Sequence, residues 1–313
     1  MAKHAILSDI HGNWEALVAV CRDFMTLDGV RSVVSLGDIV GYGAGPAAVV
    51  AGIHSLSKRG YEVHYCMGNH DAAVVGRYEF VDLRDPRDRE RLAQEAGLTT
   101  TREIARHYHD IENRKYVPVT YNAKASLAWT LENLPQQTIA FLAQRSTDYL
   151  MLVKGVLCVH ASPRDPLFGY VTDARRAQRA LETPLMNAVH LCLCGHSHIP
   201  GVWQLPAESL VRYAGNVIVM EEPRTLSGPR VQCDPEATIT VVNVGSVGQP
   251  RDGDPRACYA IYDDEAQTVE LRRVAYDIEA ARRKIIEAGL PKVLAHRLGS
   301  ADAEKDLEDL PEG

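Results

Sequence analysis

The chain has 313 residues, and its 34 Lys and Arg against 41 Asp and Glu give a formal net charge of −7. A hydrophobic content of 46% and a charged content of 24% are typical of a folded protein and exclude an intrinsically disordered chain. The acidic balance argues against broad binding to nucleic acid or to a membrane surface, which would favour a basic face. The acidic balance does not exclude the binding of a small anionic substrate in a locally positive pocket.

The first residues and the cysteines indicate a cytoplasmic protein. Asp9 and His11 interrupt the first apolar run, so no secretory signal is expected, and no run in the chain is long enough to cross a bilayer. The seven cysteines include no CxxC pair, and several lie within apolar runs. We therefore predict buried, reduced thiols rather than disulfides or a zinc cluster.

One pattern recurs five times along the chain: a short apolar run that ends in a cluster of Asp, His, Asn and Gly. The runs are residues 4–8, 33–36, 63–67, 156–159 and 191–194, and the clusters follow at residues 9–13, 37–38, 68–71, 160–162 and 195–198. Such runs predict strands that are covered on both faces. Because ligands of open α/β sheets bind at the carboxyl ends of the strands, the clusters are expected to form one site.

Helical periodicity fills the gaps between the first runs, at residues 14–27 and from Pro46 to about Gly60. Residues 76–150 differ, because they begin with a charged segment of balanced sign and continue with helical patterns that include a start at Pro135. We predict a helical insertion beside the site. A cap over the site and a purely structural role are both open.

The sequence after His198 is β-rich at residues 217–220, 238–242, 257–262 and 268–274, which suggests a second, largely antiparallel sheet. An amphipathic helix follows at residues 278–288, and the end of the chain is acidic and polar. The predicted organisation is a catalytic domain at residues 1–275, with the helical insertion at about residues 76–150, and a C-terminal helical extension with an acidic tail at residues 276–313.

The five clusters contain the side chains of a metal site. Asp9 and His11 are two residues apart at a strand end, so the alternation of a strand projects them to the same side, and the same holds for His196 and His198. The predicted ligands are Asp9, His11, Asp38, Asn69, His160, His196 and His198. This set is large enough for two ions and too large for one tetrahedral zinc ion. Mixed imidazole and carboxylate ligands favour Mn, Fe, Zn or Ni over Mg or Ca.

Taken singly, each motif has an ordinary explanation. An Asp-x-His pair occurs by chance on surfaces, and Gly-Asp usually marks a turn. The joint pattern, with ligand-type residues after every one of the five strands, favours the metal site. The four positive charges of two divalent ions exceed the two negative charges of the carboxylates. The site would therefore attract a phosphate and stabilise the charge that develops during a displacement at phosphorus.

The same motifs resemble those of the calcineurin-like metallophosphoesterase superfamily. They are Asp9-Ile10-His11, Gly37-Asp38-Ile39-Val40-Gly41, Gly68-Asn69-His70-Asp71, His160 and Gly195-His196-Ser197-His198. The sequences at residues 38–43, 160–165 and 245–251 are similar to a bacterial branch of small phosphoesterases. Val244 departs from that pattern, where Pro is expected before Gly-Ser.

The resemblance implies an α/β fold, a four-layer sandwich of two central β-sheets flanked by helices. It assigns Asp9, His11, Asp38 and His198 to one metal ion, and Asp38, Asn69, His160 and His196 to the other. It also makes His70 a catalytic residue that gives a proton to the leaving oxygen or stabilises phosphate charge.

Three further roles are expected at the site. Asp71 would orient the His70 ring and raise its pKa, although a structural turn role competes with this one. Arg251 and Arg164 would bind the substrate phosphate together with Asn69. Tyr42 is a weaker candidate for the same role.

We therefore expect metal-dependent hydrolysis of phosphate esters by two transition-metal ions, with manganese among the candidates. A phosphodiesterase that acts on small phosphodiesters or nucleotides is favoured, because no basic stripe for an extended nucleic acid is visible. The alternatives are a dinucleoside polyphosphate hydrolase, a protein phosphatase, a non-catalytic metal-binding scaffold and a binding module that senses metal or nucleotide. The native metals, the physiological substrate and the oligomeric state are left open.

Overall fold

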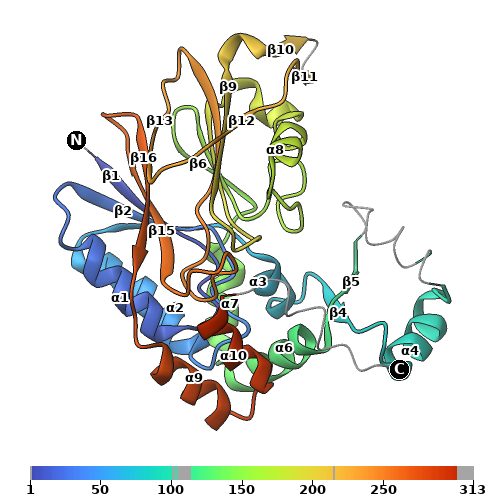
Figure 1. Cartoon of the computed structure of the whole chain (residues 1–313). Helices are drawn as coiled ribbons and strands as arrows, with labels where there is room; N and C mark the ends of the chain where they lie inside the picture. The colour runs from blue at the N-terminus through green and yellow to red at the C-terminus, as the bar shows by residue number, and fades with distance from the viewer. Residues whose placement is uncertain (1, 101–102, 104–113, 214–215, 302–313) are drawn as a thin grey trace.

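The computed structural model describes residues 2–100, 103, 114–213 and 216–301. Its centre is a pair of six-stranded sheets (Figure 1). The first sheet has the order β13 (Arg230–Gln232), β16 (Thr268–Val274), β15 (Ala257–Asp263), β1 (Lys3–Leu7), β2 (Val30–Ser35) and β3 (Glu62–Tyr65). The second has the order β12 (Arg224–Leu226), β9 (Gly201–Pro206), β14 (Thr238–Asn243), β8 (Leu191–Cys194), β7 (Val156–Val159) and β6 (Tyr149–Val153).

Helices and two small strand pairs surround these sheets. The α-helices are α1 (Trp14–Phe24), α2 (Pro46–Ser55), α3 (Asn69–Val74), α4 (Pro86–Ala96), α6 (Tyr121–Asn133), α7 (Gln136–Arg145), α8 (Ala174–Leu181), α9 (Ile278–Glu287) and α10 (Lys292–Ser300). The 3-10 helices are η1 (Leu56–Arg59), η2 (Pro184–Ala188) and η3 (Ala207–Ser209). The strand pairs are β4 (Glu79–Val81) with β5 (Tyr116–Pro118), and β10 (Leu210–Tyr213) with β11 (Asn216–Val219).

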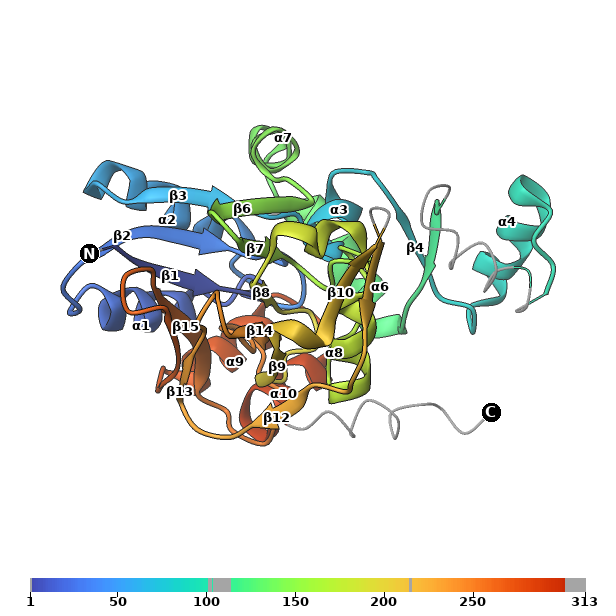
Figure 2. The ribbon, with the colours of Figure 1, turned by 90° about the horizontal axis from the view of Figure 1, so that it is seen from above.

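Strand alternation explains why the two sheets stack. In β1, Ile6 points to the second sheet and packs with Val156 and Leu191, whereas Leu7 points outward to the helices α1 and α2. In the second sheet, Leu157 points outward and packs with Leu181 of α8. The order of layers is therefore helix, sheet, sheet, helix, as the family resemblance implies, and both views show α1 and α8 on opposite sides of the sheet pair (Figure 2).

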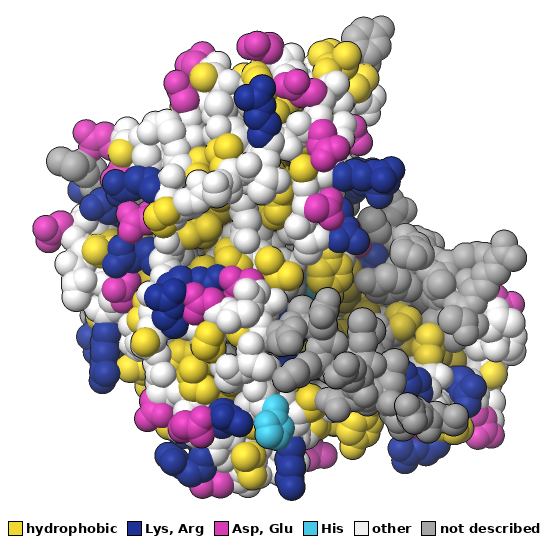
Figure 3. Space-filling view, in the orientation of Figure 1, with side chains coloured by type: hydrophobic (Ala, Val, Ile, Leu, Met, Phe, Trp, Pro, Cys, Tyr) yellow, Lys and Arg dark blue, Asp and Glu magenta, His cyan; other side chains and the backbone are white. Residues whose placement is uncertain are grey.

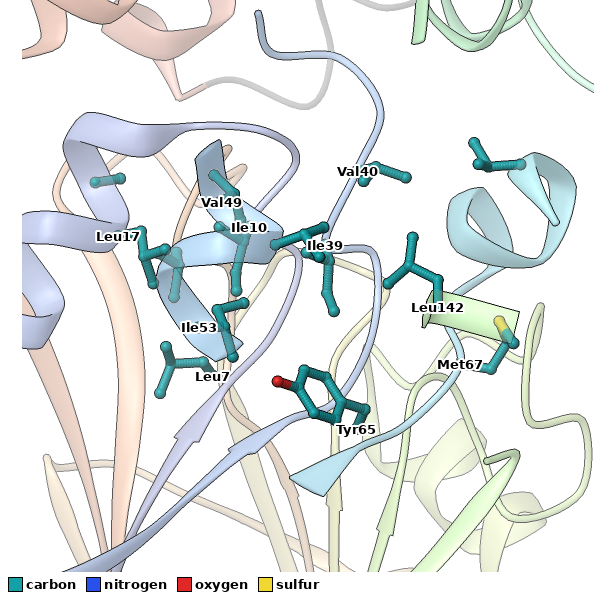
Figure 4. Packing of buried hydrophobic residues seen from close by; sticks show 14 of the residues in the cluster. Leu7, Ile10, Leu17, Ile39, Val40, Val49, Ile53, Tyr65, Met67 and Leu142 are labelled. Atoms are coloured by element: carbon teal, nitrogen blue, oxygen red, sulfur yellow. The ribbon is translucent and has the colours of Figure 1, made fainter. Parts of the chain in front are cut away.

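The largest apolar cluster lies between the first sheet and the helices α1 and α2. Leu7 of β1 and Leu17 of α1 are buried in it with Ile53 of α2 (Figure 4). Ile10 and Ile39, from the loops that follow β1 and β2, belong to the same cluster. Burial of these two side chains anchors the loops that carry Asp9 and Asp38, since each buried aliphatic side chain is worth roughly 1.5–3 kcal/mol.

The predicted strands are confirmed, but one prediction about their arrangement is wrong. The β-rich residues after His198 do not form a separate antiparallel sheet. β15 pairs antiparallel with β1, and β14 pairs parallel with β8, so these strands are divided between the two six-stranded sheets, whereas residues 217–219 belong to β11, which forms a separate pair with β10. Runs that are buried on both faces carry no information about which strand is their neighbour.

The insertion is not wholly helical. β4 and β5 form a parallel pair within it, and α4, α6 and α7 account for its described helices. Asp88 of α4 forms an ion pair with Lys124 of α6, at 2.6 Å. Part of the insertion, residues 101–102 and 104–113, lies outside the described residues.

The C-terminal extension is helical where it is described. α9 confirms the predicted amphipathic helix, and α10 packs Leu294 and Leu298 near Tyr42. The acidic tail at residues 302–313 lies outside the described residues, and the division of the chain at residue 275 stays a prediction. Within the described part of the chain, every helix is too short or too polar to cross a bilayer.

Candidate metal centre

The loops that follow β1, β2, β3, β7 and β8 meet at one edge of the sheet pair. They bring together all seven side chains that the sequence predicts as ligands, and each of them is buried. Three overlapping groups have their ligand atoms within 4.8 Å of one another: Asp9, His11 and His198; His11, Asp38 and His70; and Asp38, His160 and His196.

The argument from strand alternation for Asp9 and His11 is wrong, although both side chains reach the site. β1 ends at Leu7, and Asp9 and His11 have φ angles of 52° and 48°. His196 and His198, beyond β8, have φ angles of 65° and 61°. Non-glycine residues seldom adopt the left-handed region, and this strain is typical of functional loops. The turns, and not a strand face, direct these side chains inward.

Two glycines make the close approach of the loops possible. A Cβ atom on Gly68 would lie 2.0 Å from the backbone nitrogen of Asp38, and one on Gly195 would lie 2.6 Å from Asp9 Oδ2. Neither position has room for a side chain. Glycine is therefore required where the loops after β3 and β8 pass the two carboxylates.

The first half of the site consists of Asp9, His11 and His198. The Nδ1 atoms of His11 and His198 lie 3.1 and 2.6 Å from the carbonyl oxygens of Val40 and Gln249. These carbonyls accept from Nδ1–H, which leaves a lone pair on each Nε2. The two Nε2 atoms are 3.2 Å apart, and Asp9 Oδ1 lies 3.3 Å from that of His198. Ligands of a tetrahedral ion at about 2.0–2.1 Å would have a similar spacing.

The second half is centred on Asp38. Its Oδ1 accepts a hydrogen bond of 2.8 Å from the backbone of His70. Its Oδ2 lies 3.6 Å from His11 Nε2 and 3.5 Å from His160 Nε2, so that oxygen faces both halves. Asn69 Oδ1 lies 3.1 Å from His160 Nε2. His196 Nε2 is buried, and the described residues offer it no hydrogen-bond partner.

Electrostatics at the site favour bound cations. Burial, together with the carboxylates of Asp9 and Asp71, raises the pKa of Asp38 well above its ordinary range. Burial lowers the pKa of His11 and His196, and it lowers that of His160 to about 4. Neutral imidazoles have free lone pairs, and crowded carboxylates lack a compensating charge. Divalent ions would bind the lone pairs of the imidazoles and balance the negative charge of the carboxylates. These side chains therefore fit a pair of such ions.

His70 lies beside this cluster, on α3. Its ring centroid is 5.0 Å from that of His11 and 4.5 Å from that of Tyr42, and Phe80 of β4 packs edge-on against it at 5.3 Å. Burial lowers the pKa of His70 to about 3, helped by the nearby His198 and Arg251. The ring is therefore neutral in the protein alone, with one N–H available to donate.

The predicted role of Asp71 as the group that orients His70 is wrong. Its carboxylate accepts hydrogen bonds from the backbone N–H groups of Ile39, Val40 and Gly68, at 3.0–3.3 Å. Residues adjacent in a helix do not face each other, so Asp71 points back to the helix start while the His70 ring points into the site. These hydrogen bonds support the competing structural role, and burial lowers the pKa of His70 instead of raising it.

Replacing Asp71 with asparagine should therefore loosen the loop that carries Asp38. The substitution turns one buried carboxylate oxygen into a neutral amide oxygen and replaces the other with an NH2 group, which donates and cannot accept. We therefore expect the free energy of unfolding to fall by about 1–3 kcal/mol. Urea denaturation measures this loss, and metal analysis should show weaker binding. Asp173→Asn, at the exposed N-cap of α8, is the control and should change stability by less than about 0.5 kcal/mol. A shifted pH profile with unaltered stability would contradict the structural role.

A cavity of about 410 Å³ opens beside the metal-ligand cluster. His70 and Arg251 line it, together with the insertion residues Val117 and Thr120. The insertion thus forms a wall of the cavity, although it was uncertain from the sequence whether it had any part in the site. Arg251 Nη2 donates to Gln249 Oε1 at 2.9 Å, and its guanidinium lies 5.8 Å from the Tyr42 ring centroid.

Arg164 is not part of this cavity. Its side chain is exposed, because the loop after β7 is closed by mutual hydrogen bonds between Ser162 and Asp165. The prediction that Arg164 binds the substrate phosphate is therefore wrong.

Several lining residues were missed by the sequence analysis. They include Phe168, Tyr170, Arg84 and Arg297. One signal existed for Arg297, which stands three residues after Leu294 on the buried stripe of α10, where a charged residue is unusual.

Comparisons with known proteins identify relatives over almost the whole chain. A profile of the calcineurin-like phosphoesterase superfamily domain matches residues 2–267. An uncharacterized protein of Methanocaldococcus jannaschii is 32% identical over 302 residues, which are 94% of this chain and 96% of that one.

Two crystal structures are also similar. A metallophosphoesterase from Sphaerobacter thermophilus has a TM-score of 0.65 and 29% identity, with coverage of 96% of this chain and 99% of that one. A hypothetical protein from Pyrococcus horikoshii has a TM-score of 0.66, 21% identity and the same coverage, and this likeness concerns the fold alone.

Proposed function

Since the chain belongs to the calcineurin-like phosphoesterase superfamily and is thus a metal-dependent phosphoesterase, we propose that it acts as a phosphodiesterase on small phosphodiesters or nucleotides. The observation that carries the two-ion chemistry of this proposal is the position of Asp38 Oδ2, about equally distant from His11 Nε2 and His160 Nε2. A carboxylate oxygen shared between two imidazole sets suits a bridge between two ions.

In this proposal, Asp9, His11, Asp38 and His198 hold one ion, and Asp38, Asn69, His160 and His196 hold the other. Two such ions, when bound, polarise phosphoryl oxygens and lower the pKa of a water molecule. Their four positive charges exceed the two negative charges of Asp9 and Asp38, so the site retains a positive charge for the substrate phosphate. Manganese, iron, zinc and nickel all suit these ligands.

The chain's own groups then position the ester. Arg251, which lines the cavity, can bind a phosphate oxygen through its fork of N–H donors. His70 lies beside the cluster with a neutral ring, and its N–H can donate to the leaving oxygen or to a phosphate oxygen. Tyr42 packs against the rings of both His11 and His70, at centroid distances of 4.6 and 4.5 Å, and so restricts their movement.

The shape of the cavity supports a small substrate. About 410 Å³ suits a nucleotide-sized molecule, and the apolar wall of Val117, Pro118 and Val119 suits a non-phosphate portion. On the face drawn in Figure 3, basic and acidic side chains of the described residues are interspersed, which does not favour an extended nucleic acid. The seven free cysteines, most of them buried, support a cytoplasmic location.

Hydrolysis of bis(4-nitrophenyl) phosphate with added Mn²⁺ or Ni²⁺ tests the proposal. Parallel assays with 4-nitrophenyl phosphate, a dinucleoside polyphosphate and a phosphopeptide separate the diesterase from the alternatives. We expect the diester to have the highest kcat/KM, and EDTA to abolish turnover. If a sample with two ions per chain turned over none of these, the enzymatic proposal would be wrong. A preference for the phosphopeptide would replace it with a protein phosphatase.

A further inference from the structure

We propose that a second cavity, bounded by α2, β3, α7 and β6, binds a small phosphate monoester through Arg145 and His54. The cavity measures about 380 Å³ and, among the described residues, shares none of its lining with the cavity at the metal centre. A phosphate monoester is the product class of the phosphodiesterase proposed above. The inference stands on the second cavity alone and does not depend on that function.

The cavity lies at the edge where both six-stranded sheets end. β3 and β6 are the last strands of their sheets, and α7 packs beside them (Figure 2). The backbone of Met67 donates to the carbonyl of Thr147 at 2.8 Å, and that of Thr147 donates to the carbonyl of Tyr65 at 3.1 Å. Leu142 of α7 is buried in the same apolar cluster as Met67 (Figure 4). These contacts fix the walls, so a ligand would meet a preformed site.

The lining of this cavity favours an anion. It includes Arg145 of α7 and His54 of α2 but no Asp or Glu, in a chain whose formal net charge is −7. Arg145 is exposed, and within the described part of the chain its guanidinium has no ion pair or hydrogen bond. The nearest acidic residue along the chain, Asp148, instead accepts two hydrogen bonds from Arg77, at 2.5 and 3.0 Å. An arginine fork without a carboxylate partner matches the oxygens of a phosphate.

The aromatic part of the lining suits an apolar portion of the ligand. The Phe141 ring lies edge-on to the rings of His54 and Tyr65, with centroids 5.0 and 5.5 Å away. Phe141 thereby restrains the His54 ring, which has an N–H to donate whether it is neutral or charged. A bare phosphate would occupy little of the cavity, whereas a monoester with a ring would also bury apolar surface against these side chains.

Tyr65 supplies a second, independent observation. Its side chain lines the cavity and is only 7% exposed, and the described residues give its hydroxyl no hydrogen-bond partner. Burial raises the pKa of Tyr65 to about 12, and the charge of Arg145 opposes this rise, so the two side chains interact electrostatically. An unsatisfied buried donor calls for an explanation, and a polar ligand in the adjacent cavity supplies one.

Carbon-13 NMR of the histidine rings tests the inference on the full chain loaded with Zn²⁺, a diamagnetic ion that suits the metal centre. Phenylphosphonate is the probe, because its P–C bond resists hydrolysis, and His54→Gln identifies the His54 signal. We expect a saturable shift of that signal. In Arg145→Gln the Kd from this shift should rise roughly tenfold to a hundredfold, since a hydrogen bond to a charged group is lost. Arg31→Gln, an exposed arginine on β2 outside the cavity, is the matched control and should leave the Kd unchanged.

Arg145→Lys covers the case in which the glutamine variant is unstable, because Arg145 stands in the last turn of α7, where a cation also stabilises the helix end. The lysine keeps the charge but loses the fork, so we expect the Kd to rise about threefold with an unaltered circular dichroism spectrum. A second titration uses inorganic phosphate, which should bind at least about fivefold more weakly because it lacks the apolar portion.

Three results would overturn the inference: no saturable shift at His54, an unchanged Kd in both Arg145 variants, or equal affinity for inorganic phosphate. Diester turnover without a shift at His54 would leave the proposed function standing and remove the second site. A saturable shift at His54 that is lost in Arg145→Gln, in a chain without diester turnover, would support the second site and contradict the proposed function.

Discussion

Replacing Asp38 with asparagine is expected to abolish phosphodiester hydrolysis and metal binding together. Asp38 Oδ2 faces both imidazole sets, at 3.6 Å from His11 Nε2 and 3.5 Å from His160 Nε2. The amide keeps the size and can still accept from the backbone of His70, but it loses the negative charge that a bridge between two cations needs. We expect kcat/KM to fall by roughly a thousandfold or more.

Metal analysis after gel filtration should show fewer than two ions per chain for this variant, and circular dichroism should show an unaltered fold. Asp82→Asn is the matched control, because Asp82 is also buried and lines the same cavity but lies on the insertion. It should retain both ions. Two tightly bound ions in Asp38→Asn would remove Asp38 from the bridging position.

Replacing His70 with alanine should have a different signature: a loss of turnover without a loss of metal. His70 lies beside the ligand cluster but is not needed to complete either ligand set. Loss of its N–H should lower kcat roughly 10²–10⁴-fold, the range for a group that assists proton transfer. The ions should stay near two per chain, whereas ligand variants lose them. His64→Ala, a half-buried histidine on β3 outside the site, should retain wild-type kcat.

A comparison of esters with different leaving groups distinguishes the two possible roles of His70. If it gives a proton to the leaving oxygen, the loss should be large for an alkyl ester and small for a 4-nitrophenyl ester, whose leaving group needs little help. If it stabilises phosphate charge, both esters should lose the same factor. An unchanged kcat with both esters would exclude His70 from the mechanism.

The clustering of the seven candidate ligands was predictable from the sequence because a local rule places them. Each follows an apolar run that becomes a strand between two layers, and such strands end at a common edge. Asp38 and His160, 122 positions apart in the printed sequence, were brought together by that rule alone. The conformations that aim them were not predictable, since nothing in Asp-x-His specifies two residues in the left-handed region.

Roles that depend on the direction in which a side chain points were harder to predict. Asp71 follows His70 in the sequence, and the helix that starts at Asn69 turns the two side chains away from each other. Arg164 is close to His160 along the chain, but the closed loop leaves it exposed. Arg297 is far from every motif and reaches the cavity only because α10 packs beside Tyr42. The positions of such side chains depend on tertiary packing, which cannot be predicted from a local sequence pattern.

The central claim is that seven side chains hold two ions with Asp38 between them. Anomalous diffraction from crystals of the Mn²⁺-loaded protein, collected at the manganese edge, tests it most directly. We predict two peaks, one within coordination distance of Asp9, His11 and His198, and the other within that distance of Asn69, His160 and His196, with Asp38 touching both. A single peak, or two peaks that Asp38 does not bridge, would contradict the account.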